Sequence, residues 1–424
     1  MLLDMSIANF KSVKEIQKIS FEAIKDNRFA DSKTVEVNDK LRLIKTAAII
    51  GPNGAGKSSF VRAIESLKSI VCSKSTVENP IQVFSGTGFA YSDEKGEPCT
   101  IQMSMLLKKG DAVEEGDDPE TIKAKASIIA EYTLKSTYKK ITEETLYFIY
   151  NRSKKLMFER KIQDDPFGDD ESPVTYKYRF GKMYRGDKKR LIKKIDEKHS
   201  FLAGAAEREG ETCLAVQNWF QNSLNILPMG VSSHSEQYII SQIQKHPSWV
   251  KQLINFLWSV DITDIRNILV KNDKLIFVHT NVTMHYASYF MQESLSLRRL
   301  TLIGIAFFES FVQQKSLVID DFGMLLHPDV LTHIIEIFES CNDKVGSQLL
   351  VVDCNPTLLR PGLMRRDGVY FAEKDTESST VYFSLAQFKY SKRRDLTYNQ
   401  YLNGAFGSLP LLSEFSFQDE KEDK

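Results

Sequence analysis

The chain has 424 residues, of which 42% are hydrophobic and 26% are charged. This composition is typical of a globular protein with a sizeable core, so a wholly disordered chain is excluded. Lys and Arg together number 56, as do Asp and Glu, so the formal charge is zero and a basic coat over the whole surface is excluded.

Cysteine usage and the lengths of the apolar runs indicate the compartment. The five cysteines are widely spaced and form no Cys-x-x-Cys pair, which argues against a disulfide framework and indicates a reducing environment. The first residues, MLLDMSIANFKS, lack a signal-peptide pattern, and no run reaches about 18 consecutive apolar residues. We therefore expect a cytoplasmic protein without a membrane span.

Strand patterns dominate the first part of the chain. They fall at residues 2–10, 15–23, 46–50, 99–107 and 126–134, and continue to about Phe158. A glycine-rich turn follows 46–50, and apolar residues at helical spacing then predict a helix that begins near Ser58.

The composition changes after Phe158. Residues 161–200 are rich in charge, and the run 177–198 within them is basic. Residues 203–261 follow a helical pattern, which predicts a helical insert. A strand at 274–280 is expected to resume the sheet.

The last part of the chain alternates helices and strands. The expected elements are a helix from about Leu295 to Val312, a strand ending at Asp320, a helix over 328–340 and a strand over 348–353. Continuous apolar strands between helices predict an α/β fold with a mostly parallel core sheet, together with an antiparallel β subdomain and a helical insert. The predicted parts are 1–160, 161–262 and 263–424, the first and last forming one head and the middle being inserted.

The sequence GPNGAGKS at 51–58 fits the phosphate-binding loop pattern G-x-x-x-x-G-K-[ST]. Glycines let backbone N–H groups turn toward phosphate oxygens, the lysine reaches the β- and γ-phosphates, and the serine hydroxyl binds Mg²⁺. An apolar strand before the loop and a helix after it supply the required context. The candidate nucleotide-binding residues are Gly51, Pro52, Asn53, Gly54, Ala55, Gly56, Lys57, Ser58 and Ser59.

A phosphate-binding loop of this kind needs a carboxylate at the end of another strand to hold the magnesium ion. The apolar run LVI at 317–319 leads directly to Asp320, and Asp321 follows. We therefore predict that Ser58 and Asp320 hold Mg²⁺ together.

Five segments occur in a characteristic order. They are NFKS at 9–12, GPNGAGKS at 51–58, ESLSLRRL at 293–300, VIDDFGMLLHP at 318–328 and QLLVVDCNPTLLRP at 348–361. In order and spacing they resemble the ABC/SMC-like AAA-family ATP-binding proteins of bacterial abortive-infection and restriction-linked loci, the RloA/AbiL-like group. The resemblance covers both ends of the chain, whereas 160–262 matches only loosely.

The resemblance implies an ABC-type domain that binds ATP and Mg²⁺ and pairs face to face with a second copy. The signature segment would be 293–296, in which Ser294 meets the γ-phosphate bound to the partner. Lys11 would lie near the nucleotide, although it fits an ordinary surface lysine equally well. Gln82, shortly after the first helix, is the candidate Q-loop residue at the metal.

The sequence departs from the family pattern where hydrolysis is concerned. Asp321 stands where the family has a glutamate general base, and Ser296 where the signature has glycine. Gly323 and Leu325 replace the Asp and Ser of the D-loop, and Cys354 replaces the switch histidine. The interpretation is a nucleotide binder whose hydrolysis is slow or lost; the alternative is that Asp321 suffices as the base.

These residues favour a nucleotide-gated oligomeric sensor or scaffold in anti-phage defence, which regulates a toxic partner such as a nuclease encoded nearby. The alternative is an active DNA-linked ATPase that couples hydrolysis to remodelling. A third hypothesis, a nuclease with its site in the insert, has no acidic cluster in its favour. The basic run 182–198 fits a nucleic-acid contact or a solvated face, and His327 fits the family pattern or a structural role.

Overall fold

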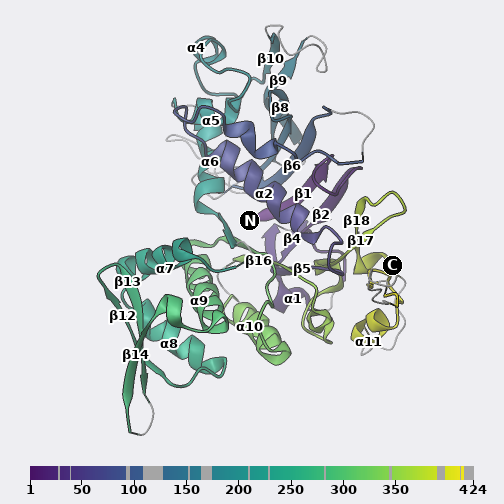
Figure 1. Cartoon of the computed structure of the whole chain (residues 1–424). Coiled ribbons are helices and arrows are strands. Elements are labelled where there is room, and N and C mark those ends of the chain that lie inside the picture. Colours follow the sequence, from purple (N-terminus) through teal and green to yellow (C-terminus); the bar gives the residue numbers. More distant parts are fainter. Residues whose placement is uncertain are drawn as a thin grey trace, which may run out of the picture.

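A six-stranded sheet lies at the centre of the computed structural model (Figure 1). The structure describes residues 1–26, 29–38, 40–91, 96–107, 128–150, 153–163, 174–208, 211–227, 230–280, 283–342, 346–388, 397–410 and 412–414. In spatial order the central strands are β11 (Leu224–Leu227), β15 (Ser316–Ile319), β16 (Gln348–Asp353), β5 (Thr46–Ile50), β17 (Val369–Lys374) and β18 (Thr380–Ser384). Neighbours are parallel except β17 and β18, as the predicted fold class requires.

The central strands are apolar throughout because both of their faces are buried. Along β5, Ala47 and Ile49 face one hydrophobic core, whereas Ala48 and Ile50 face another. A strand with a core on each side has no solvent face that would require alternate polar residues. This explains why 46–50 is a continuous apolar run.

The first core lies between the central sheet and a seven-stranded antiparallel sheet. The strands of that sheet are β10 (Tyr176–Phe180), β9 (Ser153–Ile162), β8 (Ile141–Tyr150), β7 (Ile129–Ser136), β6 (Cys99–Leu106), β1 (Leu2–Ala8) and β2 (Gln17–Ser20). Helices α2 (Lys57–Val71), α5 (Phe201–Ala206) and α6 (Glu211–Asn222) contribute to the same core. This sheet is the predicted antiparallel subdomain.

The second core is formed mainly by helices on the other face of the central sheet. They are α7 (Ser233–Lys245), α8 (Trp249–Ser259), α9 (Leu295–Gln313) and α10 (Pro328–Cys341). Figure 1 shows α7, α8 and α9 grouped with a small sheet on the opposite side of the molecule from α4 (Lys188–Ile192) and β10. None of the described helices has the length and apolar character needed to cross a lipid bilayer.

The remaining elements are short. They are α1 (Ala30–Lys33), a two-stranded sheet of β3 (Thr34–Asn38) and β4 (Leu41–Ile44), α11 (Thr397–Leu402) and the 3₁₀ turns η1 (Pro80–Phe84), η2 (Phe290–Gln292), η3 (Pro356–Leu359), η4 (Arg366–Gly368) and η5 (Leu385–Gln387).

Most of the expected elements are confirmed, with boundaries that differ by a few residues. The helix expected near Ser58 begins at Lys57, and the strand and helices of the last part match β16, α9 and α10. The strand expected at 126–134 is β7, and residues 126 and 127 lie outside the described part of the chain. The division into 1–160, 161–262 and 263–424 stays a prediction.

One expectation about the middle of the chain is wrong, and the helical insert also contains a strand. The strand at 274–280 does not resume the central sheet, because it is β13 of a separate antiparallel sheet with β12 (Ile265–Lys271) and β14 (His285–Tyr289). Asn272 and Asp273, both with positive φ, form a tight turn that pairs β13 with β12 locally. Within 203–261, β11 interrupts the helices and pairs in parallel with β15, so the insert supplies an edge strand of the central sheet.

A buried carboxylate joins the antiparallel sheet to the helical part of the insert. Glu144 on β8 is fully buried and accepts hydrogen bonds from the hydroxyls of Tyr132 and Ser200, at 2.9 and 2.8 Å. It also accepts from the backbone N–H groups of Phe201 and Leu202, at the beginning of α5, at 2.7 and 2.8 Å. The carboxylate satisfies amide groups that the first turn of the helix leaves without a partner.

We expect Glu144→Gln to lower the free energy of unfolding by about 2–4 kcal/mol, because an amide cannot accept all of these hydrogen bonds and Arg160, 3.8 Å away, loses its buried counter-charge. The neighbouring Glu143→Gln is the matched control, because Glu143 pairs with Lys135 in a partly exposed site and its loss should cost at most about 1 kcal/mol. Denaturant unfolding measures both variants, and equal effects would contradict this role of Glu144.

Candidate functional site

The candidate phosphate-binding loop joins the carboxyl end of β5 to the amino end of α2. Gly54 and Gly56 have φ angles of 79° and 92°, a left-handed conformation that glycine adopts without strain. A Cβ atom at Gly56 would overlap Thr380 Oγ1 and Ser12 Oγ. Glycine is therefore needed at position 56 for its conformation and for the close approach of neighbouring chain segments.

Hydroxyl groups from distant parts of the chain hold this loop. Thr380 Oγ1 donates to Ala55 O at 2.9 Å and is 2.7 Å from Ser12 Oγ. Ser12 Oγ is 2.9 Å from Ser59 Oγ, and Tyr382 OH donates to Gly56 O at 2.8 Å. The sequence analysis did not identify Thr380 and Tyr382, because the loop motif contains no signal for partners on β18.

Lys57 and Ser58 point in different directions from the first turn of α2. Lys57 Nζ donates to the carbonyls of Gly51 and Pro52, both at 2.9 Å, so its ammonium group lies over the loop. Ser58 Oγ donates to Asp320 Oδ1 at 3.1 Å. The structure therefore brings together a cation for phosphate and two oxygen ligands that are 262 positions apart.

The oxygens of Ser58 and Asp320 fit Mg²⁺, which prefers hydroxyl, carboxylate and phosphate oxygens. Asp320 is buried at the end of β15, where its carboxylate also accepts from the N–H of Asp321 at 3.2 Å. Bound Mg²⁺ would offset the negative charge of the phosphates. Within the described ranges, no group of three or more His, Cys, Asp or Glu side chains is arranged to hold a metal ion.

Asp321, the predicted general base, lies beside this pair with a left-handed φ of 45°. Its pKa is raised by partial burial and by the nearby carboxylates of Asp320 and Asp353, whereas Lys57 and Arg299 oppose the shift. A raised pKa makes a carboxylate a stronger proton acceptor near neutral pH. The charge of Lys57 in the loop therefore acts on the Asp321 carboxylate. The Asp321 side chain is one methylene shorter than the glutamate of the family pattern.

Arg299 is a functional candidate that sequence reasoning missed. It is fully buried on α9, and its Nη2 donates to the carbonyls of Asp320 and Asp321 at 2.7 and 3.3 Å. Burial lowers its pKa, while Asp321, Asp320 and Asp353 raise it. Arg299 therefore fixes the backbone of the two carboxylates relative to the signature helix. In the sequence, its position within ESLSLRRL was the one indication that Arg299 belongs to the site.

Gly323, where the family pattern has aspartate, is matched to its surroundings. Its N–H donates to Asp353 Oδ2, and a Cβ atom there would lie 2.6 Å from that oxygen and overlap Leu331 Cδ1. Asp353 Oδ1 accepts from Asn355 N at 2.9 Å. A side chain at position 323 therefore has no room beside Leu331 and Asp353. The neighbouring Cys354 thiol is exposed, and partial burial together with Asp353 raises its pKa.

The candidate signature segment starts α9. Ser294 is exposed and is the N-cap of the helix, its Oγ accepting from Leu297 N at 3.2 Å. Ser296 Oγ donates to Leu325 O at 2.8 Å, which ties the signature to the altered D-loop segment. Among the described residues, Ser294 has no hydrogen bond to the loop at 51–58.

Three other candidates lie apart from these contacts. Lys11 is exposed in the β1–β2 turn, where its N–H donates to Thr87 O. Gln82 is exposed on η1, and its Oε1 accepts from Asn79 Nδ2 at 3.0 Å. His327 caps α10 by accepting from Asp329 N at 3.2 Å, which is a structural role. The nucleotide contacts of Lys11 and Gln82 stay predictions.

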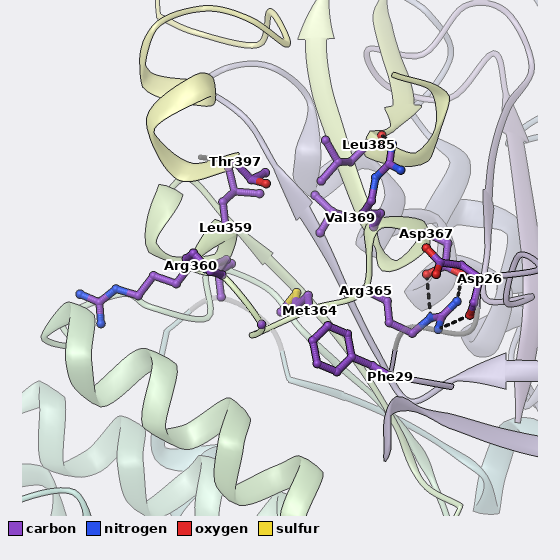
Figure 2. Close-up of a pocket in the computed structure, with 14 residues that line it drawn as sticks. Asp26, Phe29, Leu359, Arg360, Met364, Arg365, Asp367, Val369, Leu385 and Thr397 are labelled. Carbon is purple, nitrogen blue, oxygen red and sulfur yellow. Dashed lines mark hydrogen bonds and ion pairs between the residues drawn. The ribbon is translucent and has the colours of Figure 1, made fainter. Parts of the chain in front are cut away.

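A cavity of about 390 Å³ is lined by residues of η3 and η4 (Figure 2). Apolar side chains such as Phe29 and Leu359 line it. Its wall includes a bidentate ion pair in which Arg365 Nε and Nη2 donate to the Asp367 carboxylate at 3.0 and 2.8 Å (Figure 2). None of the candidate nucleotide-site residues lines it, so it is a separate feature.

We expect Lys57→Ala to weaken the binding of ATP with Mg²⁺ roughly 10- to 100-fold, because a charge-assisted hydrogen bond to phosphate contributes about 1.5–3 kcal/mol. Isothermal titration calorimetry measures the affinity. Arg62→Ala, on the exposed face of the same helix, is the control and should bind like the unaltered protein. Unchanged affinity in Lys57→Ala would disprove the assignment of the loop.

Comparison with known proteins gives the following matches. No curated protein matches the sequence. Similar solved structures include an SmcHead bound to the C-winged helix domain of ScpA (11% identity, TM-score 0.48) and an SMC head domain from Thermotoga maritima (13% identity, TM-score 0.41). A third is an Smc head with an extended coiled coil bound to the C-terminal domain of ScpA derived from Pyrococcus furiosus (10% identity, TM-score 0.44).

Each alignment covers 90% of this chain and 97%, 98% and 96% of the respective structures. The family model described as "AAA domain, putative AbiEii toxin, Type IV TA system" matches residues 47–352. This range contains the loop at 51–58, the signature segment, Asp320 and all of β16 except Asp353. The match agrees with the AAA-family resemblance inferred from the motifs, and the chain belongs to this family of AAA domains.

Proposed function

We propose that this protein binds ATP with Mg²⁺ and acts as a nucleotide-gated homodimer or higher homo-oligomer in anti-phage defence. In the ATP-bound assembly it holds or releases a toxic partner, such as a nuclease encoded nearby. Lys57 and the loop amides bind the phosphates, and Ser58 and Asp320 bind the ion. Hydrolysis is slow or lost, so the nucleotide serves as a signal.

The contrast between the two halves of the site carries this proposal. The binding half brings its groups together within the chain, since Ser58 Oγ contacts Asp320 and Lys57 Nζ lies over the loop. The hydrolysis half differs from the family pattern at Asp321, Ser296 and Cys354. A base that is one methylene too short must shift by about an ångström, and such misplacement can lower a rate by about 10²-fold.

Self-assembly is supported by the exposed start of α9. Ser294 and Leu295 are exposed there, and Leu325 is exposed on the segment that Ser296 contacts. Helix N-termini attract phosphate groups because their first amides lack partners and carry partial positive charge. This surface therefore suits the phosphates of a nucleotide bound to a second copy.

The defence role is supported by the family description, which refers to a putative AbiEii toxin and a type IV toxin–antitoxin system. A domain of this family that binds nucleotide without rapid turnover is suited to controlling a partner protein. We place it in the cytoplasm, in keeping with its unpaired cysteines, where phage nucleic acid and a nearby gene product would meet it.

A second candidate function is an active ATPase linked to DNA, and two observations favour it. The raised pKa of Asp321 is the direction expected of a general base. In addition, α4 and its flanking segments expose Lys182, Lys188, Lys189 and Lys193, which form a basic surface at the end of the antiparallel sheet. Such a surface can contact a phosphate backbone.

We expect assembly to respond to ATP and not to ADP, because Ser294 would read the γ-phosphate across the interface. Sedimentation velocity of the protein with a non-hydrolysable ATP analogue should show a larger species than the same protein with ADP. Ser294→Ala should weaken this response, whereas the matched Ser259→Ala at the end of α8 should not. Identical profiles with both nucleotides would count against the paired arrangement.

We expect turnover well below about 1 s⁻¹, the lower end of the usual enzyme range, with or without DNA. Phosphate release measures it. Asp321→Glu alone should change the rate little, whereas Asp321→Glu combined with Cys354→His should increase it by more than the product of the single effects, because both groups act on one phosphate and its attacking water.

Rapid phosphate release by the unaltered protein, abolished by Asp321→Asn, would overturn slow hydrolysis and favour the second candidate. Stimulation of that release by DNA would identify the coupled activity. The assembly result is independent of this outcome, so the two halves of the proposal are tested separately.

A further inference from the structure

A histidine between two carboxylates contacts the first residue of the candidate signature segment. His279 on β13 has Nδ1 2.7 Å from Asp264 Oδ2 and Nε2 2.9 Å from Glu293 Oε1. Ser288 on β14 donates to the same Glu293 oxygen. The ring and Glu293 are both largely buried, whereas Asp264 is exposed.

This geometry favours the imidazolium form of the ring. An ionised carboxylate only accepts hydrogen bonds, so a ring that contacts one carboxylate through each nitrogen must donate from both. A neutral imidazole has a single N–H and would leave one carboxylate without a donor. Asp264 and Glu293 raise the pKa of His279 against the opposing effect of burial.

Glu293 is the residue before Ser294, the N-cap of α9. A carboxylate at this point is adjacent to the surface on which the proposed function places the phosphates of a second copy. Two negative groups repel at short range unless a cation compensates one of them. His279 is positioned to supply that cation.

We propose that His279 is a positioning residue for the signature segment: its charge neutralises Glu293 and so permits the approach of nucleotide phosphates bound to a second copy. This rests on the proposed function, because it concerns ATP-driven assembly. Assembly is then favoured while the ring is protonated and weakens as the pH rises through the elevated pKa of His279.

The other neighbours of the imidazole ring of His279 carry no charge. On β12 the register partner of His279 is Ile265, which is apolar and buried. On β14 the partner is Tyr286, whose ring centroid lies 5.9 Å away. Ser288 Oγ, 3.2 Å from Nε2, is a neutral hydroxyl. The charged groups that face the imidazole among the described residues are therefore Asp264 and Glu293.

The test measures assembly with a non-hydrolysable ATP analogue by sedimentation velocity from pH 6 to pH 9. In the unaltered protein the assembly constant should fall roughly tenfold across this range, the equivalent of about one pKa unit. His279→Gln retains hydrogen bonding without charge and should be weak at every pH. Asp264→Asn removes one stabilising carboxylate and should move the midpoint to lower pH.

Rescue separates charge compensation from a merely structural role. Glu293→Gln in the His279→Gln background removes the uncompensated carboxylate and should restore assembly at every pH. His333→Gln, on the exposed face of α10 with Glu336 at 3.5 Å, is the matched control and should keep the profile of the unaltered protein. Thermal unfolding of each variant establishes that it folds.

Each outcome decides the matter. Assembly that is independent of pH, or a double variant as weak as His279→Gln, overturns the role of His279 and leaves ATP-driven assembly intact. A protein that binds the analogue but does not assemble at any pH overturns the proposed function, and the role of His279 with it.

Discussion

The parallel pairing of β5, β16 and β15 is the constraint on which the site depends. Parallel strands end at the same edge of a sheet, so the phosphate-binding loop, Asp353 and Asp320 meet there, although 262 positions separate Ser58 from Asp320. The hydrogen bond from Ser58 to Asp320 is a consequence of this pairing. Each strand must be buried on both faces, which requires the two separate cores on either side of the sheet.

The two cores connect the carboxyl edge of the central sheet, where the loop and the aspartates meet, to two different parts of the molecule. On one side, α2 carries Lys57 and Ser58 from the loop into the core shared with the antiparallel sheet. On the other side, α9 runs from the signature segment into the helical core, and Arg299 joins it to the backbone of Asp320 and Asp321. A buried guanidinium therefore connects the helix of the signature segment to the backbone of the two aspartates.

Departures from the family pattern belong together in space. Gly323 has no room for a side chain because Asp353 occupies the position that it would need, and Ser296 is bound to the carbonyl of Leu325. Two of the altered positions, Ser296 and Leu325, are therefore in direct contact. His279 contacts Glu293, the first residue of the same signature segment.

The sequence alone determined the features that depend on local conformation and periodicity. The glycines of the loop, the start of α2, the apolar strand before Asp320 and the course of α9 and α10 could be predicted because each depends on residues within one or two turns of one another. Only the tertiary structure decided which distant groups complete the site. Thr380 contacts the loop, Arg299 contacts the backbone of Asp320, and His279 contacts Glu293 in the signature segment. No spacing in the sequence specifies these side-chain partners. The edge position of β11 likewise depends on pairing with β15, and pairing partners are chosen by burial of the whole sheet.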